Sequence, residues 1–321
     1  MHVLIIGAAG MIGRKLAERI AATGALGGKP VNAMTLADIA EPQVAPDFSG
    51  TRTALAADLT DPGTADSLIA DRPDVIVHVA AIVSGEAEAD FDKGYSINLD
   101  GTRALFDAIR AIDGYTPRVI YASSLAVFGA PFPPKIPDDY HLTPLTSYGT
   151  QKAIGELLLN DYSRRGFLDG VGIRFPTICI RPGKPNKAAS SFYSGILREP
   201  LNGQEAVLPV GTDVRHWFAS PRSAVGYIDH AATLDTTQLG AQRNMTMPGV
   251  SATVGDQIEA LRAVAGNEAV ALIRHEPDPM VSAIISGWPR DFVTARACDL
   301  GFRAEENFRQ IIEVYLEDEM G

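Results

Sequence analysis

The stretch SYGTQK, residues 147–152, places a tyrosine four positions before a lysine. Four residues are about one helical turn, so both side chains can share a helix face with the ammonium roughly 6 Å from the phenol. At an effective dielectric near 20 this charge stabilises a phenolate by about 3 kcal/mol, which lowers the tyrosine pKa by about two units. Tyr148 beside Lys152 could then take the proton of an alcohol as a hydride leaves its carbon. In isolation such a pair is more often an ordinary helix face, so its context must decide.

A serine is placed to assist the same reaction. Ser124 ends the apolar run RVIYASS, which is typical of a buried strand. Its hydroxyl would hydrogen-bond the reacting oxygen and hold it about 3 Å from the phenol. Although a serine at a strand end is often only a turn residue, the candidate catalytic residues are Ser124, Tyr148 and Lys152.

A glycine-rich segment predicts a phosphate site. GAAGMIG follows the apolar run HVLIIG and opens an amphipathic stretch, an arrangement of strand, tight turn and helix. Its glycines would let the backbone approach a pyrophosphate, which then meets the positive end of the helix dipole. The spacing is G-x-x-G-x-x-G rather than G-x-G-x-x-G, and glycines that serve only packing are the alternative. The predicted contacts are Gly7, Gly10, Met11, Ile12 and Gly13.

Residues after the next two strands would complete a dinucleotide site. Asp38 ends the second apolar run, where a carboxylate would accept hydrogen bonds from both ribose hydroxyls and repel a 2′-phosphate. This predicts NAD rather than NADP as the cofactor. Asp58 and Leu59, after the third run, could flank the adenine. Each of the three could instead be an ordinary structural residue.

These residues need strands and helices in alternation to position them. Apolar runs continue with DVIVHVAA and GVGIRFPTICI, and the longest helical patterns lie at 90–111 and 148–165. The alternation predicts an α/β fold, a doubly wound parallel (Rossmann) sheet over residues 1–183. The chain then becomes rich in Pro, Gly and Ser before a last helix near 305–318. We expect residues 184–321 to form mainly a smaller substrate-binding lobe, although some of its segments could return to the first domain.

The bulk composition restricts the classes of function. The chain has 321 residues, a net charge of −11 and a pI near 5.0. Without a block of five basic residues, we expect no nucleic-acid partner. The first apolar run is too short for a membrane span, so we expect a cytoplasmic protein with no membrane partner. Two distant cysteines and six histidines without paired spacing predict neither a disulfide nor a metal site.

Six motifs together resemble the extended short-chain dehydrogenase/reductase family, which includes sugar-nucleotide epimerases. They are GAAGMIG, ADL, HVAA, NLDGT, SSLAVFG and YGTQK, in the family's order. The resemblance implies an NAD cofactor, catalytic roles for Ser124, Tyr148 and Lys152, and contact of Lys152 with the nicotinamide ribose. It also implies a homodimer through helices 90–111 and 148–165, which could instead only cover the sheet. The further cofactor positions that it implies are Ala80, Asn98, Pro176 and Thr177.

A narrower resemblance covers about residues 147–225. RFPTICIRPGKPNKAASSFYSGILREP and VRHWFASPRSAV resemble family members that oxidise a small sugar acid. This implies NAD-dependent oxidation of a C2 hydroxyl, most closely that of D-erythronate to 2-dehydro-D-erythronate. An acidic protein needs local cations for the substrate carboxylate, and residues 174–187 hold two arginines and two lysines without an acid. We assign Arg215 to the carboxylate, or else to a structural or dimer contact, and the other substrate contacts are Ser84, Ser124, Tyr148, Asn186 and Ser190.

Two other functions are open. A sugar-nucleotide epimerase or dehydratase would use the same tyrosine and a tightly bound NAD but return the hydride. Against it, HWFASPRSA after Arg215 differs from the aromatic–Val–Asp-Asp pattern usual in those enzymes, and SSLAV lacks a dehydratase's acid pair. A non-catalytic NAD-binding regulator is the second, although such proteins typically lose the tyrosine or the lysine. Net NADH release separates a dehydrogenase from an epimerase.

Overall fold

The computed structural model describes residues 1–43, 47–183 and 190–321. Its residues form two compact units that are each discontinuous in the chain. The sheet unit comprises Met1–Val127, Thr146–Arg174 and Val225–Met245, and the second unit comprises Phe128–Leu145, Phe175–Ala224 and Thr246–Gly321. Residues 225–245 belong to the sheet unit and residues 128–145 to the second unit, so each unit is built from three stretches of chain.

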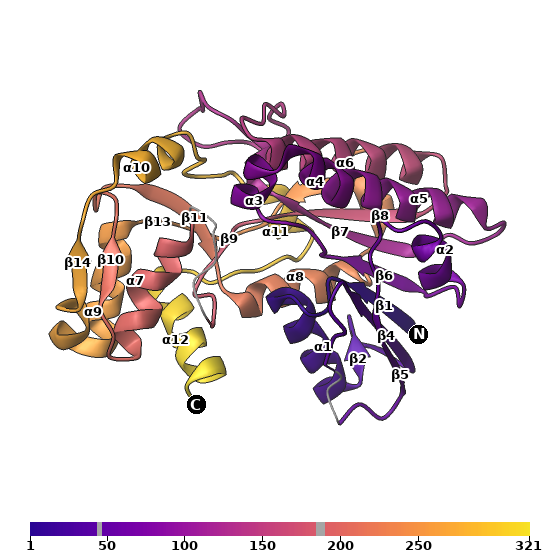
Figure 1. Cartoon of the computed structure of the whole chain (residues 1–321), viewed down its shortest axis with the longest axis horizontal. Coiled ribbons are helices and arrows are strands. Elements are labelled where there is room, and N and C mark those ends of the chain that lie inside the picture. The colour runs from indigo at the N-terminus through magenta and orange to yellow at the C-terminus, as the bar shows by residue number, and fades with distance from the viewer. Residues whose placement is uncertain (44–46, 184–189) are drawn as a thin grey trace. The chain divides into compact units, whose positions relative to one another are not determined.

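A seven-stranded sheet forms the centre of the sheet unit, with the strand order β12-β8-β7-β6-β1-β4-β5 (Figure 1). β1 pairs in parallel with β4 and β6, and the β4–β5 and β6–β7 pairs are also parallel. The chain reverses its direction of winding between β1 and β6, which is where such sheets bind ligands. The expected doubly wound α/β fold is confirmed. The strands are β1 (His2–Ile6), β4 (Ala33–Asp38), β5 (Thr51–Ala56), β6 (Val75–His78), β7 (Arg118–Ser124), β8 (Asp169–Phe175) and β12 (Asn244–Thr246).

Helices cover both faces of this sheet because side chains alternate along each strand. Leu4 and Ile6 of β1 share a buried cluster with Phe106 and Leu159 from two helices on one face. Ile5, between them, is also fully buried and faces the other side. Figure 1 shows α1 on the opposite side of the sheet from α5 and α6. The helical elements are α1 (Met11–Thr23), α2 (Thr64–Ile69), α3 (Ser84–Ala89), α4 (Phe91–Tyr95), α5 (Gly101–Ala111), α6 (Ser147–Arg164) and α8 (Pro221–Ala231), with the short turns η2 (Leu125–Val127) and η3 (Thr236–Leu239) and the hairpin β2 (Ala25–Leu26) and β3 (Lys29–Pro30).

The helix expected over 90–111 is interrupted. A π-helical turn, η1 (Ser96–Asp100), separates α4 from α5. Its extra residue per turn lets Asn98 point into the interior, where it is 1% exposed. The periodicity of apolar residues predicts the helix correctly but contains no sign of this local change.

The second unit has its own core and two small sheets, in the orders β13-β11-β9 and β10-β14. Phe218, Tyr193 and Leu261 are fully buried there. The last helix, expected near 305–318, is α12 (Phe308–Glu319). The remaining elements are β9 (Thr177–Ile178), α7 (Ser191–Leu201), β10 (Ala206–Leu208), β11 (Arg215–Ala219), β13 (Val250–Thr253), α9 (Val254–Val270), β14 (Ile273–His275), α10 (Pro279–Ser286) and α11 (Ala295–Asp299).

None of the helices in the described part of the chain combines the length and the apolar character needed to cross a membrane.

Candidate active site

Tyr148 and Lys152 lie one turn apart at the start of α6. The helix begins directly after Thr146, whose hydroxyl accepts a hydrogen bond from Gly149 N at 3.0 Å and so caps the first turn. Lys152 Nζ lies 5.8 Å from the centroid of the Tyr148 ring and 5.0 Å from that of Tyr121. The spacing thus brings the ammonium close to the phenol, as the sequence predicts.

Ser124 is the last residue of β7 and is half-buried. Its Oγ accepts a hydrogen bond from Ala126 N at 3.2 Å, which orients the hydroxyl at the end of the strand. The carbonyl of Ala122, two residues earlier in β7, accepts a hydrogen bond from Lys152 Nζ at 2.8 Å. β7 and α6 together therefore hold the three predicted catalytic residues in the sheet unit.

Lys152 is held in an unusual environment for an ammonium. It is only 2% exposed, and burial lowers its pKa to about 8. Burial, with the lysine charge as the smaller cause, lowers the pKa of His78 to about 3. Burial also raises the pKa of Tyr121 well above its usual value, with Glu156 and Tyr148 adding to the effect. At neutral pH the imidazole and the Tyr121 phenol are thus neutral beside a charged lysine, which gives that charge a strong local effect.

A buried ion pair fixes α6 against the sheet. Glu156, one turn after Lys152, accepts hydrogen bonds from Arg174 Nε and Nη2, both at 2.8 Å, and from Ser123 Oγ at 2.6 Å. The two charged side chains are 1% and 4% exposed. Arg174, one of the cations that the sequence suggests for the substrate carboxylate, is therefore occupied inside the core. In the sequence, the position of Glu156 among the buried residues of α6 was the feature that could have indicated this pair.

Asn98 and its neighbours brace the loop after β6. The Asn98 Oδ1 atom accepts from Ile82 N at 2.9 Å, and its Nδ2 donates to Gln151 Oε1 at 2.8 Å. Beside it, His78 Nε2 lies 2.9 Å from Thr102 Oγ1. The Asn98 side chain therefore links the loop to α6, and a direct role toward a cofactor stays a prediction.

The glycine segment forms a cradle that larger residues would fill. Gly7 has a φ of +96°, and a Cβ there would lie 2.5 Å from Ala80 N. A Cβ on Gly13 would lie 2.2 Å from the Gly7 carbonyl oxygen. α1 begins at Met11, and none of the described side chains caps its first turn at Gly10. The N–H groups of Met11 and Ile12 thus belong to a helix end that can receive an anion.

The predicted ribose ligand lies beside this cradle. Asp38 Oδ2 accepts a hydrogen bond from Ala9 N at 2.9 Å, and its Oδ1 accepts from Ile39 N at 2.7 Å. Each carboxylate oxygen retains further acceptor capacity for a ribose hydroxyl. The cradle, the uncapped helix end and this carboxylate fit a dinucleotide with an unmodified ribose.

The predicted adenine contacts differ in exposure. Asp58 is half-buried, and its Oδ1 accepts hydrogen bonds from Thr60 N at 2.9 Å and Thr60 Oγ1 at 2.8 Å, which closes a turn. Leu59 is 9% exposed and packs in the core of the sheet unit. Contact of either residue with adenine stays a prediction.

The predicted substrate residues are distributed over both units. Ser84 begins α3 in the sheet unit, and Ser190 precedes α7 in the second unit; both are half-buried. Arg215 donates from Nη1 to Ser251 O at 3.0 Å, and its Nη2 lies 3.7 Å from Asp256 Oδ2. Its side chain is 42% exposed, so the guanidinium is partly engaged but accessible. Asn186 lies outside the described residues.

Pro176 directly precedes β9, which begins at Thr177, and both residues belong to the second unit. Thr177 is half-buried and is hydrogen-bonded to His216 of β11, a residue that sequence reasoning did not connect with it. The two are 39 positions apart. In the sequence, the departure of HWFASP from the pattern of sugar-nucleotide enzymes was the one feature that could have drawn attention to His216.

Comparison with known proteins supplies relatives of nearly full length. Residues 3–221 match the model of the NAD dependent epimerase/dehydratase family. A D-erythronate dehydrogenase of Cupriavidus necator is 45% identical over 322 residues, 99% of this chain and 98% of that protein. A D-erythronate dehydrogenase of Haemophilus influenzae is 40% identical over 320 residues and all of both chains. A crystal structure described as a nucleoside-diphosphate-sugar epimerase from Agrobacterium tumefaciens has a TM-score of 0.98 and 64% identity, covering 100% of this chain and 95% of that one.

Proposed function

The chain belongs to the NAD dependent epimerase/dehydratase family, and we propose that it is an NAD-dependent dehydrogenase that oxidises D-erythronate at C2 to 2-dehydro-D-erythronate. The main support for this proposal is the sequence identity, 45% and 40%, that the chain shares with two D-erythronate dehydrogenases over almost the full length of all three proteins. The cofactor is NAD, in accord with the family and with the fit of the glycine cradle and Asp38.

The proposed chemistry assigns one task to each residue of the catalytic trio. NAD, when bound, would supply the acceptor for the hydride that leaves C2. Tyr148, as phenolate, accepts the hydroxyl proton, so that the products are a neutral ketone, NADH and a protonated tyrosine. Lys152 lowers the pKa of that phenol with its buried charge. Ser124 donates a hydrogen bond to the reacting oxygen and keeps it oriented toward the base.

The remaining contacts are assigned by chemistry. Residues of the cradle and the N-terminal turn of α1 would hold the pyrophosphate, and Asp38 the adenosine ribose. Arg215, already partly engaged with Asp256, would hold the substrate carboxylate, because an exposed ion pair is weak and readily exchanged. The further proposed contacts are Asp58, Leu59, Ala80, Asn98, Pro176 and Thr177 for the cofactor, and Ser84, Asn186 and Ser190 for substrate hydroxyls.

The decisive experiment follows NADH absorbance with a panel of four- to six-carbon aldonates and UDP-sugars. We expect NADH to accumulate with D-erythronate. The variant Tyr148→Phe should abolish turnover yet bind NAD almost as the parent protein does, because only the base is removed. Turnover of sugar nucleotides alone, without NADH accumulation, would overturn the assignment.

The second candidate is epimerisation of a sugar nucleotide, which the description of the A. tumefaciens structure favours. Such an enzyme would take the hydride and return it to the same substrate, so its NAD would not be consumed. Product analysis of each UDP-sugar by NMR, without added NAD, tests it directly. A changed sugar configuration with no lag would support epimerisation.

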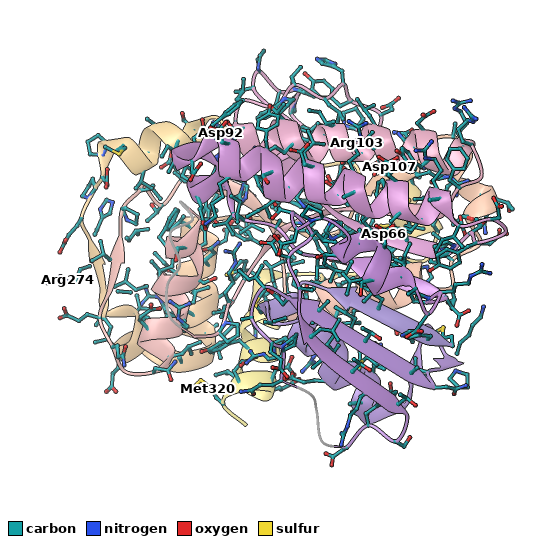
Figure 2. All side chains as sticks on the ribbon, turned by 45° about the vertical axis from the view of Figure 1, so that its right-hand side comes forward. Asp66, Asp92, Arg103, Asp107, Arg274 and Met320 are labelled. Atoms are coloured by element: carbon teal, nitrogen blue, oxygen red, sulfur yellow. The ribbon has the colours of Figure 1, made fainter. Side chains whose placement is uncertain are left out.

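We also propose a cytoplasmic homodimer that joins through helices 90–111 and 148–165. Phe91 and Leu157 in these segments are 58% and 62% exposed, so both are accessible to a second copy of the chain. The outer side of α4 and α5 also carries the charged side chains of Asp92, Arg103 and Asp107 (Figure 2).

Sedimentation should show a dimer, and Leu157→Asp should shift it toward monomer. A monomeric parent protein would refute the interface.

A further inference from the structure

His216 and Thr177 form a hydrogen-bonded pair between the parallel strands β11 and β9. The imidazole Nε2 lies 2.7 Å from Thr177 Oγ1, and Nδ1 lies 2.8 Å from Pro289 O. The His216 ring is 3% exposed and stacks on Tyr193, with centroids 5.4 Å apart and an interplanar angle of 6°. Trp288 lies beside it at 5.4 Å. The packing therefore fixes the orientation of the ring, which is buried too deeply to serve as an exposed acid or base.

The partners determine where each hydrogen lies. The Pro289 carbonyl can only accept, so Nδ1 must carry a hydrogen. Burial lowers the pKa of His216 to about 4, so the ring is neutral at neutral pH and Nε2 is an acceptor. Thr177 must then donate its single hydroxyl hydrogen to Nε2. Only lone pairs of Thr177 Oγ1 are left for any other partner.

We propose that His216 is a positioning residue that makes the Thr177 hydroxyl an acceptor, so that it binds a neutral hydrogen-bond donor of the bound cofactor or substrate. The inference rests on the proposed function, in which Thr177 lies beside the nicotinamide. The donor is the carboxamide NH₂ of the nicotinamide or a hydroxyl of the sugar acid. An ionised carboxylate or phosphate oxygen can only accept hydrogen bonds, so it cannot form one with this hydroxyl. Thr177 therefore does not compete with Arg215 for the substrate carboxylate, and it disfavours a nucleotide diphosphate at this point.

Nuclear magnetic resonance tests the arrangement of hydrogens without any turnover. In protein labelled with ¹⁵N-histidine, His216, assigned by comparison with His216→Phe, should show a protonated Nδ1 and an unprotonated Nε2. Its signals should not titrate around pH 6.5, the usual histidine value. A hydrogen on Nε2, or a titration near that pH, would overturn the proposal.

Binding measurements then identify the donor. Thr177→Val removes the acceptor at nearly constant volume and should weaken the ligand that supplies the donor by about fivefold, the typical effect of one neutral hydrogen bond. If the donor is the carboxamide, the loss appears with NAD and disappears with the 3-acetylpyridine analogue, which lacks the N–H group. If it is a sugar-acid hydroxyl, the loss appears with D-erythronate in the presence of NADH and disappears with the corresponding deoxy acid. Equal losses for every ligand, or none, would refute the inference.

Two further variants separate this role from a purely structural one. Thr177→Ser keeps the hydroxyl and should restore binding. His216→Phe keeps an aromatic ring against Tyr193 but releases the hydroxyl hydrogen, so the preference for the donor ligand over its analogue should fall toward one. An unchanged preference would contradict the proposal. The parent protein's NADH formation with D-erythronate is measured separately: its failure refutes the proposed function, while the resonance and NAD-binding results still decide the role of His216.

Discussion

Replacing Lys152 by methionine should inactivate the protein and change its stability in a pH-dependent way. Methionine keeps the length of the side chain and its apolar contacts but removes the buried charge. The pKa of Lys152 falls from 10.5 to about 8 because the ammonium is buried. At 1.36 kcal/mol per pKa unit, this charge opposes folding by about 3 kcal/mol at neutral pH.

The sign of the effect follows from proton binding. Below pH 8 the lysine is charged in both the folded and unfolded chain, and the full penalty is present. Between that pH and the unfolded value, the unfolded chain binds more protons, so the stability of the parent protein rises with pH. Methionine carries no titratable group, so the stability of Lys152→Met does not change with pH for this reason. The difference in the free energy of unfolding, parent protein minus variant, should therefore rise by about 2–3 kcal/mol between pH 7 and 10.

Urea denaturation of both apoproteins at several pH values measures this difference. Loss of the hydrogen bond to Ala122 O lowers the stability of the variant by a roughly constant amount, so the slope against pH is the informative quantity. Lys29→Met, at an exposed position of β3, controls for the exchange of lysine for methionine. A parent-to-variant difference that stays constant from pH 7 to 10 would refute the view that Lys152 is held as a desolvated charge.

Three other substitutions test the site and its support. Glu156→Gln should leave the Arg174 charge buried without its counter-ion and lower the free energy of unfolding by about 3–5 kcal/mol in urea denaturation; a loss under about 1 kcal/mol would contradict the buried pair. Gly155→Ala places a Cβ 2.2 Å from Tyr121 Oη and 2.6 Å from Tyr121 Cζ and should lower the free energy of unfolding by about 1–3 kcal/mol in urea denaturation. Tyr121→Phe in the same chain should restore only part of this loss, because the ring carbon stays in place; an unchanged free energy of unfolding in Gly155→Ala would contradict the close packing. Asp38→Ser should raise the KM for NAD by about tenfold or more and permit turnover with NADP, whereas unchanged cofactor preference in steady-state kinetics would remove Asp38 from the ribose site.

Much of the fold and of the candidate site was predictable because its signals are local. Strand and helix periods, the glycines after β1 and an acid at the end of β4 are all visible within short windows of sequence. Tyr148 and Lys152 come together by helical spacing alone. The six motifs in order then predict the family and the cofactor, which the relatives confirm.

Pairings across long stretches of chain were decided only by the tertiary structure. It buries Lys152 and so changes its pKa, removes Arg174 from the substrate cations by pairing it with Glu156, and joins Thr177 to His216. None of these could be predicted, because a side chain's partner and its exposure depend on which distant segments pack around it. Sequence alone therefore predicted the candidate reacting groups, whereas the folded chain determined how deeply Lys152 is buried and which distant residues contact these groups.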